Sequence, residues 1–205
     1  MHSNSKLVFQ RYARPHFTPN ARVLEIGPDA HPSTYQTMVA DPTIIWDTLD
    51  RSPAPNLTYT AMSDYEFPIP DDAYDIVLSG QVIEHVRKIW VWIREVARVC
   101  RPGGLVITIG PVSWPYHEAP VDCWRAYPEG MKALYEEAAL SDVWCWWGSL
   151  EATGHRRFIP GRSAEWQPRV LNLSYRMLGG LGLPVEVAYD TITIGRKPGG
   201  TDRHR

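Results

Sequence analysis

The sequence predicts an α/β protein with a mostly parallel sheet, and three observations carry that prediction. Residues 23–26 form a short apolar run rich in branched side chains, too short for a helix and typical of a buried parallel strand. Gly27 follows directly, where a missing side chain lets the backbone turn sharply and approach a ligand. Asp50 closes a second apolar stretch, at about the 20-residue spacing of an acid that binds a ribose. Together these features favour a cofactor that carries a nucleoside.

The strands follow from short apolar runs bounded by turn residues. We expect strands at residues 23–26, 43–47 (extending as far as 49), 57–60, 74–78, 105–109, 143–147 and 187–194. The turn at residues 70–72, Pro-Asp-Asp, introduces the fourth of them. The last two should form an antiparallel edge of a seven-stranded sheet.

The helices follow from capping residues and apolar spacing. Residues 33–39 should form a first helix, although two prolines interrupt the segment before it. From 89 to 100 the apolar positions 89, 93, 96 and 100 share one helical face, and the Arg-Pro-Gly-Gly segment at 101–104 ends that helix. Residues 128–139 begin with a proline, which suits the first turn of a helix.

Length and charge favour one domain spanning residues 1–205, with an N-terminal helix and extended arm at 1–20 acting as a lid, a long excursion at 156–168 and a flexible tail at 199–205. A net charge of −2 and a pI near 6.4 provide no attraction to nucleic acid or anionic lipid, so neither partner is expected. Three cysteines without metal-ligand spacing and no apolar leader predict a cytoplasmic chain. A homodimer is compatible with this composition.

Four ordered blocks carry a family resemblance. They are the strand and glycine at 23–27, and the segments 67–79, 81–86 and 99–108. In this order they resemble the class I S-adenosylmethionine-dependent methyltransferases, in particular the small bacterial, type 11-like members that methylate sugars and other small molecules. The resemblance covers roughly residues 20–140 and implies a Rossmann-like class I methyltransferase fold with S-adenosylmethionine as cofactor. It departs at Asp29, where the family usually has a second glycine; Asp tolerates positive φ better than most residues.

The resemblance places the cofactor at the strand ends. The residues that we expect to bind it are Glu25, Gly27, Asp29, Asp50, Ser63, Asp64 and Gln81. Asp50 would accept hydrogen bonds from both ribose hydroxyls, with Asp47 as the alternative because the end of the second strand is not fixed by the sequence. Ser63 and Asp64 fall where the family contacts adenine, and Gln81 flanks the methionine moiety.

The loop at 114–125 follows the fifth strand at its carboxyl end, where ligands bind in such sheets. We expect His117 to be the general base for an acceptor hydroxyl, with Asp122 orienting it, Glu118 beside it and His85 as the reserve candidate, because imidazole titrates near neutral pH. The alternatives are that the loop at 114–125 is only structural and that Glu84 and His85 merely cap the next helix. A magnesium ion on His117, Glu118 and Asp122 is a minority alternative.

The same loop should also bind the acceptor, through Tyr116, Trp114, Trp124 and Arg125. It resembles the sugar-modifying subgroup, where a His-Pro-type loop precedes an Asp-x-Trp-Arg sequence, here at 122–125. Asp122 and Arg125 could instead simply neutralise each other.

The sequence therefore predicts an O-methyltransferase that acts on a hydroxyl of a carbohydrate or glycosylated small molecule, such as a polysaccharide precursor. Two alternatives stay open: an N-methyltransferase acting on a sugar amine, RNA or protein, and a catalytically inactive cofactor-binding partner protein. A nicotinamide dehydrogenase is disfavoured, because the full G-x-G-x-x-G fingerprint is absent.

Overall fold

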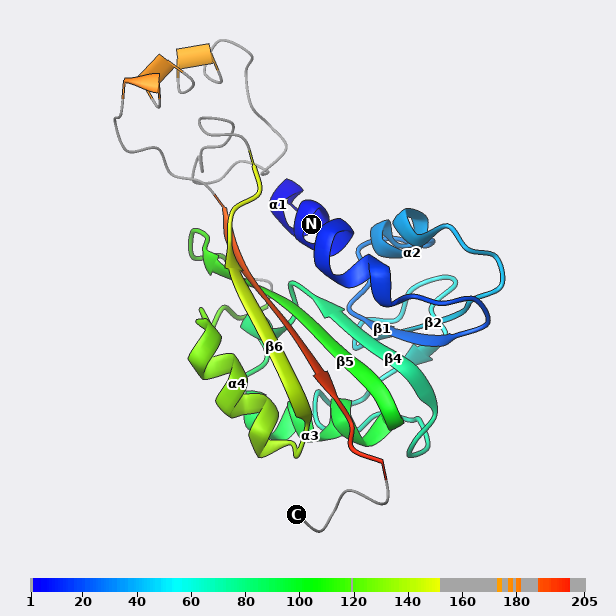
Figure 1. Ribbon diagram of the computed structural model, residues 1–205. Helices are drawn as coiled ribbons and strands as arrows, with labels where there is room; N and C mark the ends of the chain where they lie inside the picture. Colours follow the sequence, from blue (N-terminus) through cyan, green and yellow to red (C-terminus); the bar gives the residue numbers. More distant parts are fainter. Residues whose placement is uncertain are drawn as a thin grey trace.

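The computed structural model describes residues 2–118, 120–151, 173–174, 177–178, 180–181 and 188–199. Figure 1 shows one twisted sheet with helices on both faces. The strands are β1 (Arg22–Ile26), β2 (Ile45–Asp50), β3 (Tyr59–Thr60), β4 (Tyr74–Gly80), β5 (Cys100–Ser113), β6 (Ser141–Gly148) and β7 (Tyr189–Arg196). The helices are α1 (Ser3–Val8), α2 (Thr34–Val39), α3 (Ile89–Val99) and α4 (Pro128–Glu137). Short π-helical and 3₁₀ turns lie at Phe9–Ala13, Arg14–His16 and Ile83–His85.

The sheet has seven strands in the order β3-β2-β1-β4-β5-β7-β6. The first five strands in that order pair in parallel, and β7 runs antiparallel to both β5 and β6. The predicted Rossmann-like α/β fold is therefore confirmed. The strand of reversed direction, β7, lies one place in from the edge, and β6 forms the edge itself.

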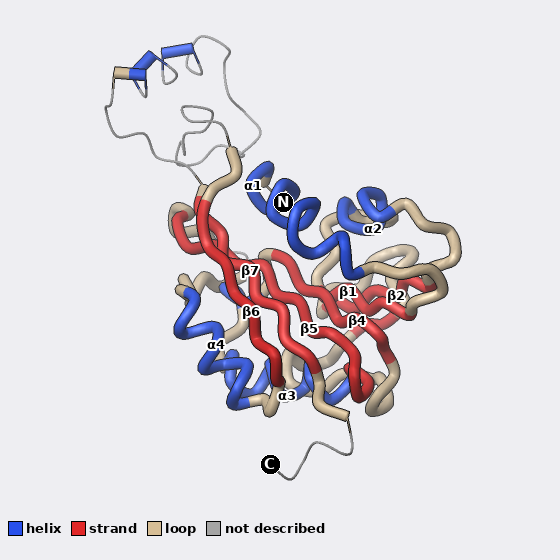
Figure 2. The backbone as a smooth tube through the Cα atoms, viewed as in Figure 1, coloured by secondary structure: helices blue, strands red, loops and turns tan. Residues whose placement is uncertain are grey.

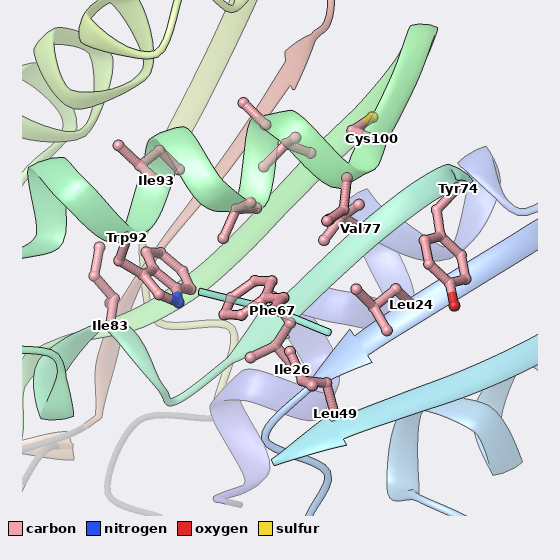
Figure 3. Packing of buried hydrophobic residues seen from close by; sticks show 14 of the residues in the cluster. Leu24, Ile26, Leu49, Phe67, Tyr74, Val77, Ile83, Trp92, Ile93 and Cys100 are labelled. Atoms are coloured by element: carbon pink, nitrogen blue, oxygen red, sulfur yellow. The ribbon is translucent and has the colours of Figure 1, made fainter. Parts of the chain in front are cut away.

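Figure 2 shows helices on both faces of the sheet, and an apolar cluster lies on each face. On one face α3 and α4 pack through residues such as Trp92 and Tyr135. Figure 3 shows Trp92 and Phe67 between α3 and the strands, next to Ile26 and Leu49. On the opposite face the N-terminal helical segment and α2 form the second layer. A helical layer on each face is what a buried parallel sheet requires.

The N-terminal segment differs from the extended arm that the sequence predicted. Residues 3–16 are helical throughout, and Pro15 lies inside a 3₁₀ turn rather than in extended chain. The reason is burial, because Val8, Phe9 and Ala13 are fully buried against the sheet. The segment is therefore part of the core, and its role as a lid over the cofactor stays a prediction.

The strands β1, β4, β5 and β6 are longer than predicted, and β2 begins two residues later than predicted. β2 continues to Asp50, and β5 begins at Cys100 and includes the Arg-Pro-Gly-Gly segment that was expected to be a turn. That segment continues the strand because Gly103 and Gly104 exchange backbone hydrogen bonds with Lys197, just beyond β7. The expected excursion at 156–168 and residues 200–205 of the expected tail lie outside the described residues. Within the described part, no helix is long and apolar enough to cross a membrane.

Candidate active site

A cleft of about 1090 Å³ opens at the carboxyl ends of β1, β2 and β4. Gly27, Asp50 and Gln81, each at or just after the end of one of these strands, lie in its wall. Starting from β1, the chain adds β2 and β3 on one side of the sheet and then β4 on the other. Such topological switch points are where open α/β sheets bind ligands. The fold therefore positions the cofactor residues predicted from three separate segments around one cavity.

Gly27 makes the turn that opens the cleft. Its φ is +69°, and its N–H donates to the carbonyl of Leu49 at 2.9 Å. A Cβ at this position would meet a methyl carbon of Val82 at 2.4 Å, so only glycine fits. Asp29, in place of the family's second glycine, does not adopt a positive φ. Its carboxylate accepts hydrogen bonds from the backbone N–H and the hydroxyl of Thr34 and supports the start of α2.

Glu25 does not line the cleft. Its carboxylate is buried and accepts hydrogen bonds from the hydroxyl of Ser33 and, at 2.8 Å, from the indole N–H of Trp46. Burial raises the pKa of Glu25 to about 7, with a smaller contribution from the charge of Asp29. The structure thus places Glu25 and Asp29 around the β1–α2 connection, whereas the other five predicted cofactor residues line the cavity.

Asp50 and Asp47 are separated by the direction of their side chains. Asp50 lies in the cleft wall, and within the described part of the chain its carboxylate accepts one hydrogen bond, from the backbone N–H of Ser52 at 2.8 Å, which leaves its second oxygen available. Asp47 is not among the cleft residues; its carboxylate accepts from the hydroxyl of Tyr74 at 2.9 Å and lies 3.7 Å from Arg22. Of the two candidates, Asp50 is the one that can reach a ribose in this cavity.

The far wall of the cleft follows β3. Ser63 and Asp64 both lie in it, as the sequence predicted. The hydroxyl of Ser63 accepts from the backbone N–H of Tyr65, and Asp64 pairs with Arg51 at 3.2 Å across the mouth of the cavity. The carboxylate of Asp64 and the hydroxyl of Ser63 therefore belong to residues that line the same cavity as Gly27 and Asp50.

Gln81 connects the cleft to the N-terminal helix and to β7. Its side-chain amide donates to the hydroxyl of Ser5 at 2.8 Å and to the carboxylate of Asp190 at 3.0 Å. Asp190 is fully buried and also accepts from Asn4 at 2.7 Å and contacts His2 at 3.1 Å. The N-terminal helix and β7 therefore fix the position of Gln81.

Glu84, His85 and His117 come together at one side of the cleft. One ligand-type atom from each lies within 4.8 Å of the other two, and the rings of His85 and His117 are 5.1 Å apart in an edge-to-face arrangement. Glu84 is 1% exposed, and burial raises the pKa of its carboxyl to about 8. His85 lies within the 3₁₀ turn after β4 and does not cap α3, whose N-cap residue is Lys88. The helix-cap interpretation of this segment is therefore wrong.

The loop after β5 is organised around a buried carboxylate. Asp122 pairs through both oxygens with the guanidinium of Arg125, which also donates to the carbonyls of Trp114 and Trp124. Hydrogen bonding from Arg125 lowers the pKa of Asp122 to about 2. The same carboxylate accepts from the backbone N–H of His117 at 2.9 Å and lies 3.3 Å from its Nδ1. Asp122 and Arg125 thus neutralise each other and also orient His117.

The predicted acceptor-binding residues are dispersed. Trp114 stacks on His2 with ring centroids 4.4 Å apart, and Trp124 donates its indole N–H to the carbonyl of Val86. Tyr116 is 71% exposed and donates to Glu118 at 2.8 Å, so this pair faces solvent at the edge of the loop. Glu118 does not belong to the group formed by Glu84, His85 and His117. The structure therefore does not bring together the set of His117, Glu118 and Asp122 that was suggested for magnesium.

Sequence reasoning missed the importance of Glu84 and Asp190. Glu84 looked like part of a helix cap, and Asp190 fell within a strand expected at the sheet edge. A carboxylate inside an otherwise apolar segment was the available signal in both cases, because a buried charge needs a partner. The groups around each carboxylate, however, include residues far away in sequence: Asn4 and Gln81 beside Asp190, and His117 near Glu84.

Comparison with known proteins agrees with this geometry. Residues 35–108 match the methyltransferase domain family Methyltransf_11. An uncharacterized methyltransferase of Mycobacteroides abscessus is 45% identical over 53 residues, which cover 26% of this chain and 20% of that relative. The match therefore spans only about a fifth of the relative's length.

Solved structures extend the likeness to nearly the whole fold. A SAM-dependent methyltransferase from Archaeoglobus fulgidus has a TM-score of 0.64 at 16% identity and covers 94% of both chains. Phosphoethanolamine N-methyltransferase 2 from Haemonchus contortus, solved with phosphomonomethylethanolamine and S-adenosylhomocysteine, has a TM-score of 0.62 at 12% identity over 95% of this chain and 52% of that one. The fold is that of the class I methyltransferases, and residues 35–108 are similar to their methyltransferase domain family.

Proposed function

We propose that this protein transfers the methyl group of S-adenosylmethionine to a hydroxyl of a carbohydrate or glycosylated small molecule. The observation that carries the proposal is the pair of imidazoles beside the cleft, where His85 lies in the wall and His117 is 5.1 Å from it, ring to ring. A hydroxyl acceptor must lose its proton during attack, whereas an amine acceptor needs less assistance. Imidazoles at the acceptor side of the cavity suit the first requirement.

The cofactor residues have complementary tasks in this proposal. Gly27 allows the methionine end to approach the backbone, and the free oxygen of Asp50 accepts from the ribose hydroxyls. Ser63 and Asp64 border the adenine, and Gln81, fixed by Ser5 and Asp190, borders the methionine end. The protein then holds the sulfonium methyl in a constant place, and positioning alone can provide effective molarities on the order of 10⁵ M or more.

The acceptor would enter over the loop after β5. Tyr116 is the exposed aromatic residue of that loop, and the exposed Trp90 packs edge-to-face on Trp124 beside it. Flat aromatic faces suit the apolar C–H surface of a sugar ring. Arg125 is occupied by Asp122 and by backbone carbonyls, so its part in the proposal is to shape the loop.

Deprotonation of the acceptor depends on His117 in this proposal. Replacing it with alanine should lower kcat by about 10²–10⁴-fold, the usual contribution of a general base, while the affinity for S-adenosylmethionine stays nearly unchanged. The measurement is mass spectrometry of products from a sugar panel incubated with labelled cofactor, alongside calorimetry of cofactor binding. His16→Ala, at an exposed histidine away from the cleft, is the matched control.

Other results would redirect the proposal. If His117→Ala keeps near-native kcat and His85→Ala does not, the role passes to His85. Label found on nitrogen would move the acceptor to the amine class. A protein that fails to bind S-adenosylmethionine would be the inactive partner protein instead.

A further inference from the structure

Glu84, His85 and His117 form a compact group of metal-ligand side chains, which we name the EHH cluster. The first two residues lie in the 3₁₀ turn after β4, and His117 lies in the loop after β5. One donor atom from each lies within 4.8 Å of the others, a spacing that one bound ion could bridge with small side-chain rotations. Because β4 and β5 are neighbours in the sheet, the loops at their carboxyl ends meet beside the cleft.

Both imidazoles are oriented as metal-binding imidazoles usually are. The Nδ1 atom of His85 lies 2.5 Å from the carbonyl oxygen of Val121, and that of His117 lies 3.2 Å from the carbonyl oxygen of Pro115 and 3.3 Å from Asp122. A carbonyl can only accept, so each Nδ1 carries the proton and each Nε2 keeps a free lone pair. Histidines that ligate metals typically donate their other N–H to a carbonyl or carboxylate in this way.

The third member presents a buried oxygen without a partner. Oε2 of Glu84 makes no hydrogen bond within the described residues, although the side chain is 1% exposed. The nearby guanidinium of Arg125 is already paired with both oxygens of Asp122. An unsatisfied buried carboxylate is costly, and a bound cation would satisfy it.

We propose that the EHH cluster binds a divalent first-row transition-metal ion. Two imidazole nitrogens and one carboxylate oxygen suit Zn²⁺, Mn²⁺, Fe²⁺ or Co²⁺, whereas Mg²⁺ prefers an all-oxygen set. Three protein ligands leave at least one coordination position open, as in catalytic rather than structural sites. His85 lines the cleft, so the acceptor is the natural ligand for that position.

The ion gives the proposed methyl transfer a specific chemistry, and this step rests on the proposed function. The acceptor hydroxyl oxygen coordinates the ion, which stabilises the alkoxide, and the hydroxyl proton passes to water. The oxygen lone pair then forms the new O–C bond as the S–CH₃ bond breaks, and the electron pair returns to sulfur. The products are the methyl ether, neutral S-adenosylhomocysteine and one proton. With the ion bound, His85 and His117 act as ligands, and the ion replaces His117 as the group that activates the acceptor hydroxyl, so neither imidazole has to take the proton.

Cobalt binding to the whole chain tests the site directly. The protein is freed of metal with a chelator, dialysed and titrated with Co²⁺ while ligand-field absorption is recorded. We expect one Co²⁺ per chain. His85→Ala, His117→Ala and Glu84→Gln should each weaken binding by more than the roughly 10–100-fold that loss of an outer-sphere partner causes. His16→Ala should bind like the unmodified protein, and unchanged affinity for S-adenosylmethionine shows that each variant is folded.

The outcomes separate the metal site from the proposed function. If a protein that still binds S-adenosylmethionine binds Co²⁺ non-specifically or not at all, the metal site is overturned. If methyl transfer continues in the presence of chelator, His117 keeps its role as general base and is not needed as a metal ligand. Saturable Co²⁺ binding that the three ligand variants lose supports the site even if no hydroxyl acceptor is methylated, in which case the proposed function fails alone. Site-specific binding with methyl transfer that ignores the metal would overturn the role of the ion in catalysis.

Discussion

The cleft at the strand ends depends on the absence of a side chain at Gly27. The residue turns the chain with φ near +69°, and the methyl groups of Val82 fill the volume that a side chain would need. Asp50, at the end of β2, lies in the wall of the same cavity, and within the described residues one of its carboxylate oxygens accepts no hydrogen bond. At the scale of residues, the site is therefore defined as much by an absent side chain as by the polar groups around it.

Gly27→Ala should damage both stability and cofactor binding. An L-residue in the left-handed region costs roughly 1–2 kcal/mol, and the contact with Val82 adds roughly 1–3 kcal/mol of overpacking. Urea unfolding and calorimetric titration with S-adenosylmethionine measure the two effects. Adding Val82→Ala should recover the overpacking part only, and Gly130→Ala in α4, where a new Cβ meets nothing within 4 Å, should not destabilise the protein. Full recovery in the double variant would show that the backbone conformation is unstrained.

Asp50→Ala should weaken binding of S-adenosylmethionine by roughly 1.5–3 kcal/mol, the usual contribution of hydrogen bonds to a charged group. Isothermal calorimetry measures this change. Asp47→Ala is the matched control, since Asp47 lies outside the cleft and holds Tyr74. It should leave cofactor affinity unchanged and lower only the free energy of unfolding. A larger loss of affinity in the Asp47 variant would reverse the assignment of the ribose-binding acid.

At the scale of elements, the buried carboxylate of Glu25 links two strands and a helix. Glu25 joins β1 to the N-terminus of α2 through Ser33, which also caps that helix by accepting from the N–H of Gln36. Trp46 on β2 donates to the same carboxylate. One acidic side chain thus connects β1, β2 and α2, and its protonation state affects the free energy of unfolding.

The free energy of unfolding should fall with rising pH because of Glu25. Its folded pKa of about 7 lies above the value of 4.5 expected in the unfolded chain, so its contribution is complete below pH 4.5 and lost as the pH rises through 7. The change is about 3 kcal/mol, at about 1.4 kcal/mol for each pH unit. Urea unfolding across that range measures it. Glu25→Gln should remove this part of the slope, whereas Glu129→Gln, at an exposed carboxylate, should not. Equal slopes in the parent and the Glu25 variant would contradict the assignment.

At the scale of the whole molecule, the sequence predicts what is local and misses what is distant. Apolar runs locate the strands, because burial on both faces of a parallel sheet requires them. The extension of β5 through Gly103 depends on Lys197, and the burial of Glu84 depends on the loop that contains His117, so neither could be inferred from neighbouring residues. Likewise, Glu25 and Asp50 both sit on strands that end at the cleft. Only the observed direction of each side chain shows that Asp50 faces the cavity and that Glu25 faces the N-terminus of α2.

The place of β7 has a consequence for synthesis on the ribosome. This strand lies between β5 and β6 and is translated after both, so those two strands cannot be joined until residues 189–196 have emerged. Asp190 on the same strand accepts hydrogen bonds from Asn4 and Gln81, so the N-terminal helix and the wall of the cleft at Gln81 also depend on the arrival of β7. A nascent chain therefore exposes the unpaired edges of β5 and β6 until β7 has emerged.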